Sequence, residues 1–243
     1  MKPLVVIPAR RGSKRLAEKN ILPLAGRPML AYTLEAALKS GIFVEAIVST
    51  EDLGIARIAE GLGASVHERP GELAGDLVSA TDVCLDVLAA RRRSGEDYDS
   101  IVCLQPTSPL RTCEDIRGAW HAFCAAEADF LVSVTPIDPH FFHWAVHRKG
   151  DAWEMFFADR FMLERPLLPP VFRPNGSIKI GRVDPLLERR NFFGPRLAVY
   201  ETPEERSIHV AERSDFDYAG FLLSRRADSA ATGRLASERP AGS

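Results

Sequence analysis

The sequence predicts an α/β fold in which helices flank a mostly parallel β-sheet. Residues 4–7 read LVVI, an unbroken apolar run that is typical of a strand covered on both faces. Strand and helix patterns then alternate as β-α-β-α-β within the first 67 residues. This alternation favours parallel strands joined by right-handed crossovers.

The first half of the chain supplies three of the expected strands and two helices. We place them at residues 4–7, 28–40, 45–50, 52–61 and 65–67. Pro28 suits the first turn of its helix, Gly41 the C-terminal cap and Asp52 an N-cap.

The second half continues the pattern after a loop rich in proline, glycine and charge. We expect helices at residues 79–93, 113–126, 186–190 and 215–224, and strands at 100–104, 130–134 and 197–200. Residues 172–180 are expected to form a turn followed by a strand. Residues 136–175 interrupt this order because they are rich in aromatic residues and proline. They form either a loop that packs its rings on the core or a β excursion used for dimerisation and for covering a sugar pocket.

Size, composition and charge suit one domain that binds neither nucleic acid nor membrane. The chain has 243 residues, 46% of them hydrophobic, and a net charge of −2. No apolar run approaches the roughly 20 residues of a membrane span. The N-terminus lacks a signal-peptide pattern and the four cysteines form no C-x-x-C pair, so we expect a cytoplasmic protein. We place the domain at residues 1–224 and a disordered tail at 225–243.

Basic residues are concentrated in the loop that follows the first strand. Arg10, Arg11, Lys14, Arg15 and Lys19 lie there together with a glycine and a serine. Mutual repulsion makes such a loop costly unless an anion neutralises it. The carboxyl end of a strand in an open α/β sheet is also where ligands bind. A solvated basic loop is the competing interpretation, and neither a P-loop nor a G-x-G-x-x-G pattern is present.

Four separated motifs resemble those of the acylneuraminate cytidylyltransferase family. In order they read IPARRGSKRLAEKN, RPGELAGD, LQPTSPLR and FRPNGSIKI, and they lie within residues 4–180. The resemblance implies a Rossmann-like nucleotidyltransferase with a mixed sheet, usually homodimeric. It also implies a reaction that joins CTP to a sialic-acid-like 2-keto-3-deoxy sugar acid and releases pyrophosphate.

The resemblance also assigns site residues, carried over position by position. Those expected to bind the nucleotide are Ala9, Arg10, Gly12, Ser13, Lys14, Lys19, Asn20, Arg69 and Ser79, and among them Arg10 and Lys19 are the expected catalytic residues. Those expected to bind the sugar acid are Gln105, Thr107, Ser108, Arg111, His143, Arg173, Asn175, Lys179, Phe192 and Phe193. Arginine and lysine fit the chemistry, because a sugar anion must meet a polyanion and more charge develops on pyrophosphate.

The expected Mg²⁺ site departs from the family pattern. The family carries two aspartates around one residue, whereas this chain has His209 and Ala211 at those positions. Alanine cannot ligate a metal, and histidine is a poor ligand for Mg²⁺. We therefore consider His209, Asp215 and Asp217 as candidate ligands, or a metal held by the triphosphate itself. A sugar-1-phosphate nucleotidyltransferase and a nucleotide-binding pseudoenzyme remain alternative functions.

Overall fold

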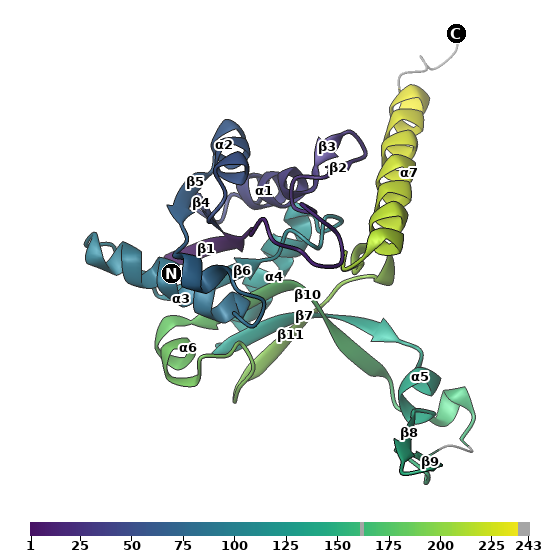
Figure 1. Ribbon diagram of the computed structural model, residues 1–243. Helices are drawn as coiled ribbons and strands as arrows, with labels where there is room; N and C mark the ends of the chain where they lie inside the picture. The colour runs from purple at the N-terminus through teal and green to yellow at the C-terminus, as the bar shows by residue number, and fades with distance from the viewer. Residues whose placement is uncertain (161–162, 238–243) are drawn as a thin grey trace.

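The computed structural model describes residues 1–160 and 163–237 and confirms the α/β fold with a mixed, mostly parallel sheet (Figure 1). Seven strands form the central sheet in the order β11-β7-β10-β6-β1-β4-β5. Their bounds are β1 (Pro3–Pro8), β4 (Ala46–Thr50), β5 (Ser65–Glu68), β6 (Ser100–Leu104), β7 (Phe130–Ile137), β10 (Val171–Arg182) and β11 (Leu197–Glu201). Strand β10 runs antiparallel to β6 and β7, and the other pairings are parallel.

Helices cover both faces of this sheet, as the apolar run of the first strand predicts. They are α1 (Met29–Ser40), α2 (Leu53–Gly61), α3 (Ala80–Arg93), α4 (Cys113–Ala125) and α6 (Val183–Arg189). Helices α5 (Pro139–His143) and α7 (Arg213–Ser237) lie away from the sheet (Figure 1). Val5 and Ile7 of β1 face a cluster that includes residues of α1, α2 and α4. Leu4 and Val6 face the opposite cluster, which includes residues of α3 and α6. Alternate residues of one strand therefore enter two cores.

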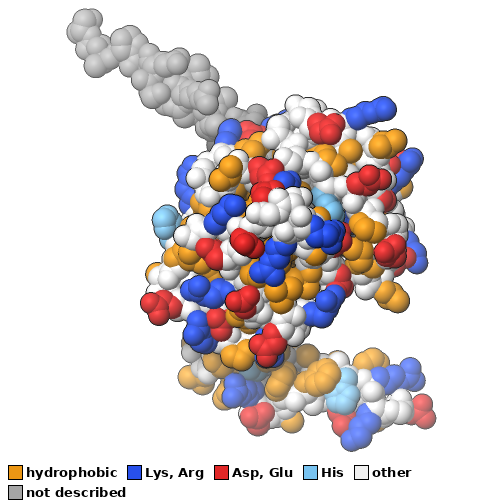
Figure 2. Space-filling view, turned by 90° about the vertical axis from the view of Figure 1, so that its left-hand side faces the viewer, with side chains coloured by type: hydrophobic (Ala, Val, Ile, Leu, Met, Phe, Trp, Pro, Cys, Tyr) orange, Lys and Arg blue, Asp and Glu red, His pale blue; other side chains and the backbone are white. Residues whose placement is uncertain are grey.

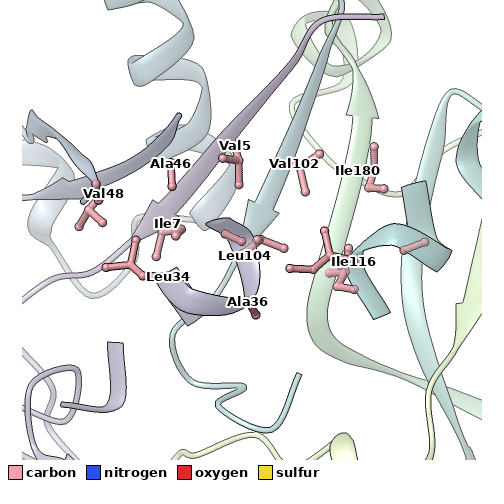
Figure 3. Close-up of a cluster of buried hydrophobic side chains, with 14 of the residues drawn as sticks. Val5, Ile7, Leu34, Ala36, Ala46, Val48, Val102, Leu104, Ile116 and Ile180 are labelled. Carbon is pink, nitrogen blue, oxygen red and sulfur yellow. The ribbon is translucent and has the colours of Figure 1, made fainter. Parts of the chain in front are cut away.

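Figure 3 shows the first of these clusters. Side chains such as Val5 of β1, Val102 of β6 and Ile180 of β10 lie on one face of the sheet, with Leu34 of α1 and Ile116 of α4 packed against them. Burial of this apolar surface, worth about 25 cal/mol per Å², is the main force that holds the helices on the sheet. The rigid sheet in turn fixes where its strand ends lie.

Two predicted helix caps are confirmed. The Asp52 carboxylate accepts a hydrogen bond from the Ile55 backbone N–H (2.8 Å) at the start of α2. Gly41 ends α1 in the left-handed region at φ 68°, a conformation that glycine adopts without steric cost.

The excursion at residues 136–175 projects from the body of the molecule (Figure 1). The extended ends of β7 and β10 carry α5 and a small hairpin formed by β8 (Val146–Lys149) and β9 (Ala152–Met155). Phe141 is 82% exposed and Trp153 is 67% exposed. These rings do not pack on the central core, so that interpretation is wrong for them. A role of the excursion in dimerisation stays a prediction.

The C-terminal part differs from the predicted tail. Helix α7 begins at Arg213 and continues to Ser237, so residues 225–237 are helical where we expected disorder. The rest of the predicted tail, residues 238–243, lies outside the described residues. Within the described parts of the chain, we find no helix with the length and apolarity needed to cross a membrane.

Candidate active site

A cleft of about 240 Å³ lies at the carboxyl ends of β1 and β6. Its lining comes from four parts of the chain: Pro8, Arg10, Lys19 and Asn20 after β1; Arg69, Leu73, Gly75, Val78, Ser79, Ala80 and Val83 between β5 and the first turn of α3; Gln105, Pro106 and Thr107 after β6; and His209 before α7. Parallel strands end at the same edge of a sheet, so segments distant in sequence meet there. The position agrees with the one expected for the basic loop.

The basic loop is closed by Asn20. Its side-chain amide donates a hydrogen bond to the Arg10 carbonyl (2.7 Å), and only 6% of the residue is exposed. Ala9 is anchored to the neighbouring strand, because its N–H donates to the Ser49 carbonyl (3.0 Å). Both residues therefore shape the loop that presents the cations. Gly12 and Ser13 lie in the same loop but do not line the cleft.

The cations of the loop point in different directions. Arg10 lines the cleft, donates to the Ala74 carbonyl (3.1 Å) and forms an ion pair with Asp76 (3.0 Å). Lys14 also pairs with Asp76 (2.6 Å). The hydrogen bond from Lys14, with the charge of Arg10 nearby, lowers the pKa of the Asp76 carboxyl. An internal carboxylate thus partly neutralises the loop, although the cleft beside Arg10 stays open.

Arg11 points away from the cleft. Its guanidinium pairs with Glu18 (3.0 Å) and Asp52 (3.3 Å), and its backbone N–H donates to Glu51 (2.8 Å). The competing interpretation, a basic loop neutralised at the surface, therefore holds for this arginine.

Lys19 reaches the cleft from the far end of the loop. Its Nζ donates a hydrogen bond to the Val210 carbonyl (3.2 Å). Burial lowers the pKa of Lys19, and the charges of Arg15 and Arg10 lower it further. This ammonium therefore lies among like charges, an arrangement that an anionic ligand would relieve.

The opposite wall combines Arg69 with the start of α3. Arg69 is 4% exposed, and its Nε donates to the Ser49 hydroxyl (3.2 Å). Burial lowers the pKa of its guanidinium. Ser79 caps α3, where its hydroxyl accepts from the Asp82 N–H (3.1 Å) and donates to the Asp82 carboxylate (2.7 Å). The wall above Ser79 is apolar and includes Ala80 and Val83.

Gln105, Thr107 and His209 form the third side of the cleft. The Thr107 hydroxyl lies 3.4 Å from Gln105 Oε1 and 3.3 Å from His209 Nδ1. Gly176 packs against them at φ +71°, and a Cβ there would lie 3.6 Å from His209 Nδ1 and 3.7 Å from Gln105 Oε1. Burial, followed by the charge of Lys19, lowers the pKa of His209 and so favours its neutral imidazole.

Three residues expected to bind the sugar are buried in the interior, so their contact with the sugar stays a prediction. Ser108 is 1% exposed. Arg111 is 4% exposed and donates to the Ser177 carbonyl (2.6 Å) and the Thr33 hydroxyl (2.7 Å). Asn175 is 3% exposed and forms hydrogen bonds with Ser133 of β7 and with Thr202 and Ser207, which follow β11. None of the three lines the cleft.

The other predicted sugar residues lie outside the cleft as well. Phe192 is 1% exposed and packs in the cluster that contains Phe130, the first residue of β7, so it does not line this cleft and its role at the sugar pocket stays a prediction. His143 is buried in the excursion between Phe142 and Phe157. Arg173, Lys179 and Phe193 are exposed or half-buried and do not line it, so their roles stay predictions.

The candidate metal ligands do not form a metal site. The Asp215 carboxylate accepts hydrogen bonds from the Ala211 N–H (2.9 Å) and the Glu212 N–H (3.0 Å) at the start of α7. Asp217 pairs with Arg213 (2.9 Å). Among the side chains that the structure describes, no group of three or more from His, Cys, Asp or Glu is arranged to hold an ion. The described side chains therefore do not fit a resident Mg²⁺, and the cation stays an expectation.

Sequence reasoning missed two groups that shape the cleft. Asp76 lies in the motif RPGELAGD, but no local pattern indicates that its carboxylate pairs with residues 62 and 66 positions earlier in the chain. The Val210 carbonyl is a backbone group, which carries no sequence signal at all.

The face in Figure 2 shows lysine and arginine interspersed with aspartate and glutamate, so it carries no continuous basic surface. This agrees with the expectation from net charge that the positive residues act locally.

Comparisons with known proteins show what this chain is similar to. The model of the cytidylyltransferase family matches residues 4–140. The chain is 36% identical over 219 residues to the N-acylneuraminate cytidylyltransferase of Streptococcus agalactiae, covering 89% of this chain and 52% of that protein. It is 35% identical over 204 residues to the CMP-N,N'-diacetyllegionaminic acid synthase of Legionella pneumophila, covering 79% of this chain and 83% of that protein.

A solved structure extends the similarity to the fold. The CMP:2-keto-3-deoxy-manno-octonic acid synthetase complexed with CTP superposes with a TM-score of 0.70 at 17% identity, covering 93% of this chain and 100% of that one. The chain spans about half the length of the N-acylneuraminate cytidylyltransferases it matches. On the match of the family model and the relatives of comparable length, the chain belongs to the cytidylyltransferase family.

Proposed function

We propose that this protein is a cytidylyltransferase that joins CTP to a sialic-acid-like 2-keto-3-deoxy sugar acid, giving the CMP-sugar and pyrophosphate. The observation that carries the proposal is the cleft itself, where Arg10, Lys19 and Arg69 converge at the carboxyl edge of the sheet. The names of the relatives favour the substrate class, because they act in the synthesis of CMP-activated sugar acids.

The geometry suits the charge problem of this reaction. The anomeric hydroxyl of the sugar acid attacks the α-phosphorus of CTP and loses its proton to solvent. A new O–P bond forms, the bond between the α-phosphorus and the oxygen that bridges to the β-phosphate breaks, and pyrophosphate leaves. Arg10 and Lys19 offset the repulsion between the two anions and stabilise charge on the leaving pyrophosphate. The apolar wall at Ala80 and Val83 suits the base, and the amide of Gln105 suits sugar hydroxyls.

Three finer expectations belong to the same proposal. A divalent cation, expected to be Mg²⁺, enters with the phosphates of CTP, since the described residues offer no carboxylate set for it. The protein works as a homodimer, and it works in the cytoplasm.

Pyrophosphate release is the measurement that tests the function. We expect release with CTP and Mg²⁺ in the presence of one acid from a panel of N-acetylneuraminic, legionaminic, pseudaminic and 2-keto-3-deoxy-octonic acids. Arg10→Ala is the control: it should abolish release and leave the melting temperature of the ligand-free protein nearly unchanged, because its ion pair with Asp76 is solvent-exposed.

Two other outcomes would point elsewhere. Release only with sugar 1-phosphates would indicate a sugar-1-phosphate nucleotidyltransferase. Tight CTP binding without turnover would indicate a nucleotide-binding pseudoenzyme, which the lack of a clustered metal site among the described residues favours as the second candidate.

A further inference from the structure

Five buried polar residues form one hydrogen-bonded group behind the cleft, which we call the Asn175 cluster. They come from β7, from β10 and from the chain that leaves β11, and they are Ser133, Asn175, Ser177, Thr202 and Ser207. Each is at most 3% exposed. Buried polar groups in such a network hold one geometry, because any partner that moves away leaves another unsatisfied.

The side-chain amide of Asn175 is fully used inside this cluster. Its Oδ1 accepts hydrogen bonds from the Ser133 hydroxyl (2.6 Å) and the Ser177 N–H (3.1 Å). Its Nδ2 donates to the Thr202 hydroxyl (2.6 Å) and the Ser207 hydroxyl (2.9 Å). An asparagine amide has two donor hydrogens and one oxygen with two lone pairs, so no capacity remains for a sugar hydroxyl.

The cluster anchors the chain segment that enters the cleft. Ser207 is held by Asn175, and its hydroxyl also donates to the Pro203 carbonyl (2.8 Å). Three residues later, the Val210 carbonyl accepts the hydrogen bond from Lys19 Nζ (3.2 Å). Within the described parts of the chain, this is the one hydrogen bond that the Lys19 ammonium donates. The Val210 carbonyl therefore sets the direction of the Lys19 side chain.

Asn175 also fixes the backbone of β10 that packs against the His209 side of the cleft. It precedes Gly176, where the pairing of β10 with β7 shifts register between Pro174 and Lys179. Gly176 packs against His209 and Gln105, both of which line the cleft. The cluster thus determines where two parts of the lining lie without contacting the cleft itself.

We propose that Asn175 is a positioning residue for nucleotide binding, acting through Ser207 and the Val210 carbonyl to aim Lys19 at the triphosphate of CTP. The inference rests on the proposed function, which supplies the triphosphate. It replaces the direct sugar contact that the sequence motif implies for Asn175, because the amide has no free donor or acceptor.

A double-mutant cycle on CTP binding tests this coupling. Calorimetric titration of the Asn175→Ala, Lys19→Met and doubly substituted proteins with CTP measures it without requiring turnover. We expect Lys19→Met to weaken CTP binding by about tenfold in the wild-type background, as loss of a charged phosphate contact does. In the Asn175→Ala background, where Lys19 is no longer aimed, the same change should weaken binding by less than about threefold.

Two further variants separate positioning from general stability. Ser207→Ala removes one link and leaves the other three bonds of Asn175, so the cycle can be repeated on it if Asn175→Ala does not fold. Ser40→Ala is the matched control: Ser40 is 4% exposed and donates to the Ala37 carbonyl (2.6 Å) at the end of α1. It should lower the melting temperature while leaving CTP affinity unchanged.

The inference is overturned if Lys19→Met weakens CTP binding equally in both backgrounds. It is also overturned if Asn175→Ala leaves CTP affinity unchanged and raises KM for the sugar acid alone, because Asn175 would then contact the sugar. Wild-type protein that fails to bind CTP would overturn the proposed function together with this inference, whereas the first two results leave the function standing.

Discussion

At the scale of single residues, the cleft is notable for its excess of positive charge. Arg10, Lys19 and Arg69 line it, whereas no aspartate or glutamate of the described chain does so. His209 stands among these cations, and burial together with the charge of Lys19 lowers its pKa. The pocket therefore suits polyanions and disfavours any further positive charge.

The lowered pKa of His209 predicts a pH effect on stability. The folded protein binds a proton at His209 less readily than the unfolded chain, whose histidine titrates at the ordinary 6.5. Stability from this residue is therefore present above that pH and is lost as the pH falls toward the lower folded pKa. We expect the melting temperature to drop between about pH 7.5 and about pH 5.5.

His209→Asn isolates this contribution, because Asn keeps a hydrogen-bonding atom for Thr107 and does not titrate. Its melting temperature should fall less over the same pH range. Identical pH profiles for the two proteins would show that His209 titrates normally.

At the scale of elements, the loop between β5 and α3 supplies both a wall and a counter-ion. It contains the short 3₁₀ helix η1 (Gly71–Ala74) and the Asp76 carboxylate that pairs with Arg10 and Lys14. The triphosphate of CTP would compete with this carboxylate for the same cations. Because the side chains of Asp76 and Lys14 are 44% and 83% exposed, solvent screens their pair and the competition is modest.

Replacing Asp76 by Asn should therefore lower KM for CTP, by roughly two- to fivefold at low salt and less at high salt. Glu72→Gln is the matched control, since it makes the same charge change in the same loop, at a residue for which no ion pair with these cations is described. A rise in KM for Asp76→Asn would mean that Asp76 assists CTP binding instead of competing with it.

At the scale of the whole molecule, two parts extend from the α/β body (Figure 1). Helix α7 is one of them, and the excursion carried by β7 and β10 is the other. The excursion exposes large aromatic side chains, among them Phe141 (82%), Trp153 (67%) and Phe156 (59%). Clustered exposed aromatic residues are typical of protein–protein interfaces.

If the excursion forms the proposed homodimer interface, substituting Phe141→Ser together with Trp153→Ser should raise the dimer Kd by at least about tenfold, because aromatic residues dominate interface energy. Analytical ultracentrifugation over a concentration series measures it. Val44→Ser is the control, since Val44 is 97% exposed outside the excursion. A wild-type protein that stays monomeric, or a double variant that dimerises as the wild type does, would contradict this role.

Local patterns in the sequence determined most of the elements and the place of the cleft. Strands β1 and β6 are buried on both faces, so each appears in the sequence as a continuous apolar run. The caps at Asp52 and Gly41 depend only on neighbours within a few residues, so they too could be predicted. The carboxyl end of β1 follows from strand order, so the position of the basic loop beside the cleft was predictable. Family motifs then indicated which residue types to expect around it.

Only the tertiary structure decided which of those residues face the cleft. The sequence motifs assign Asn175 and Arg111 to sugar binding. In the structure, both side chains form hydrogen bonds with groups that are distant along the chain. Phe192 is buried because it packs against hydrophobic residues such as Phe130 and Leu186. The orientation of a side chain depends on long-range packing and on which buried polar groups need hydrogen-bond partners. Neither can be predicted from the neighbouring residues in the sequence.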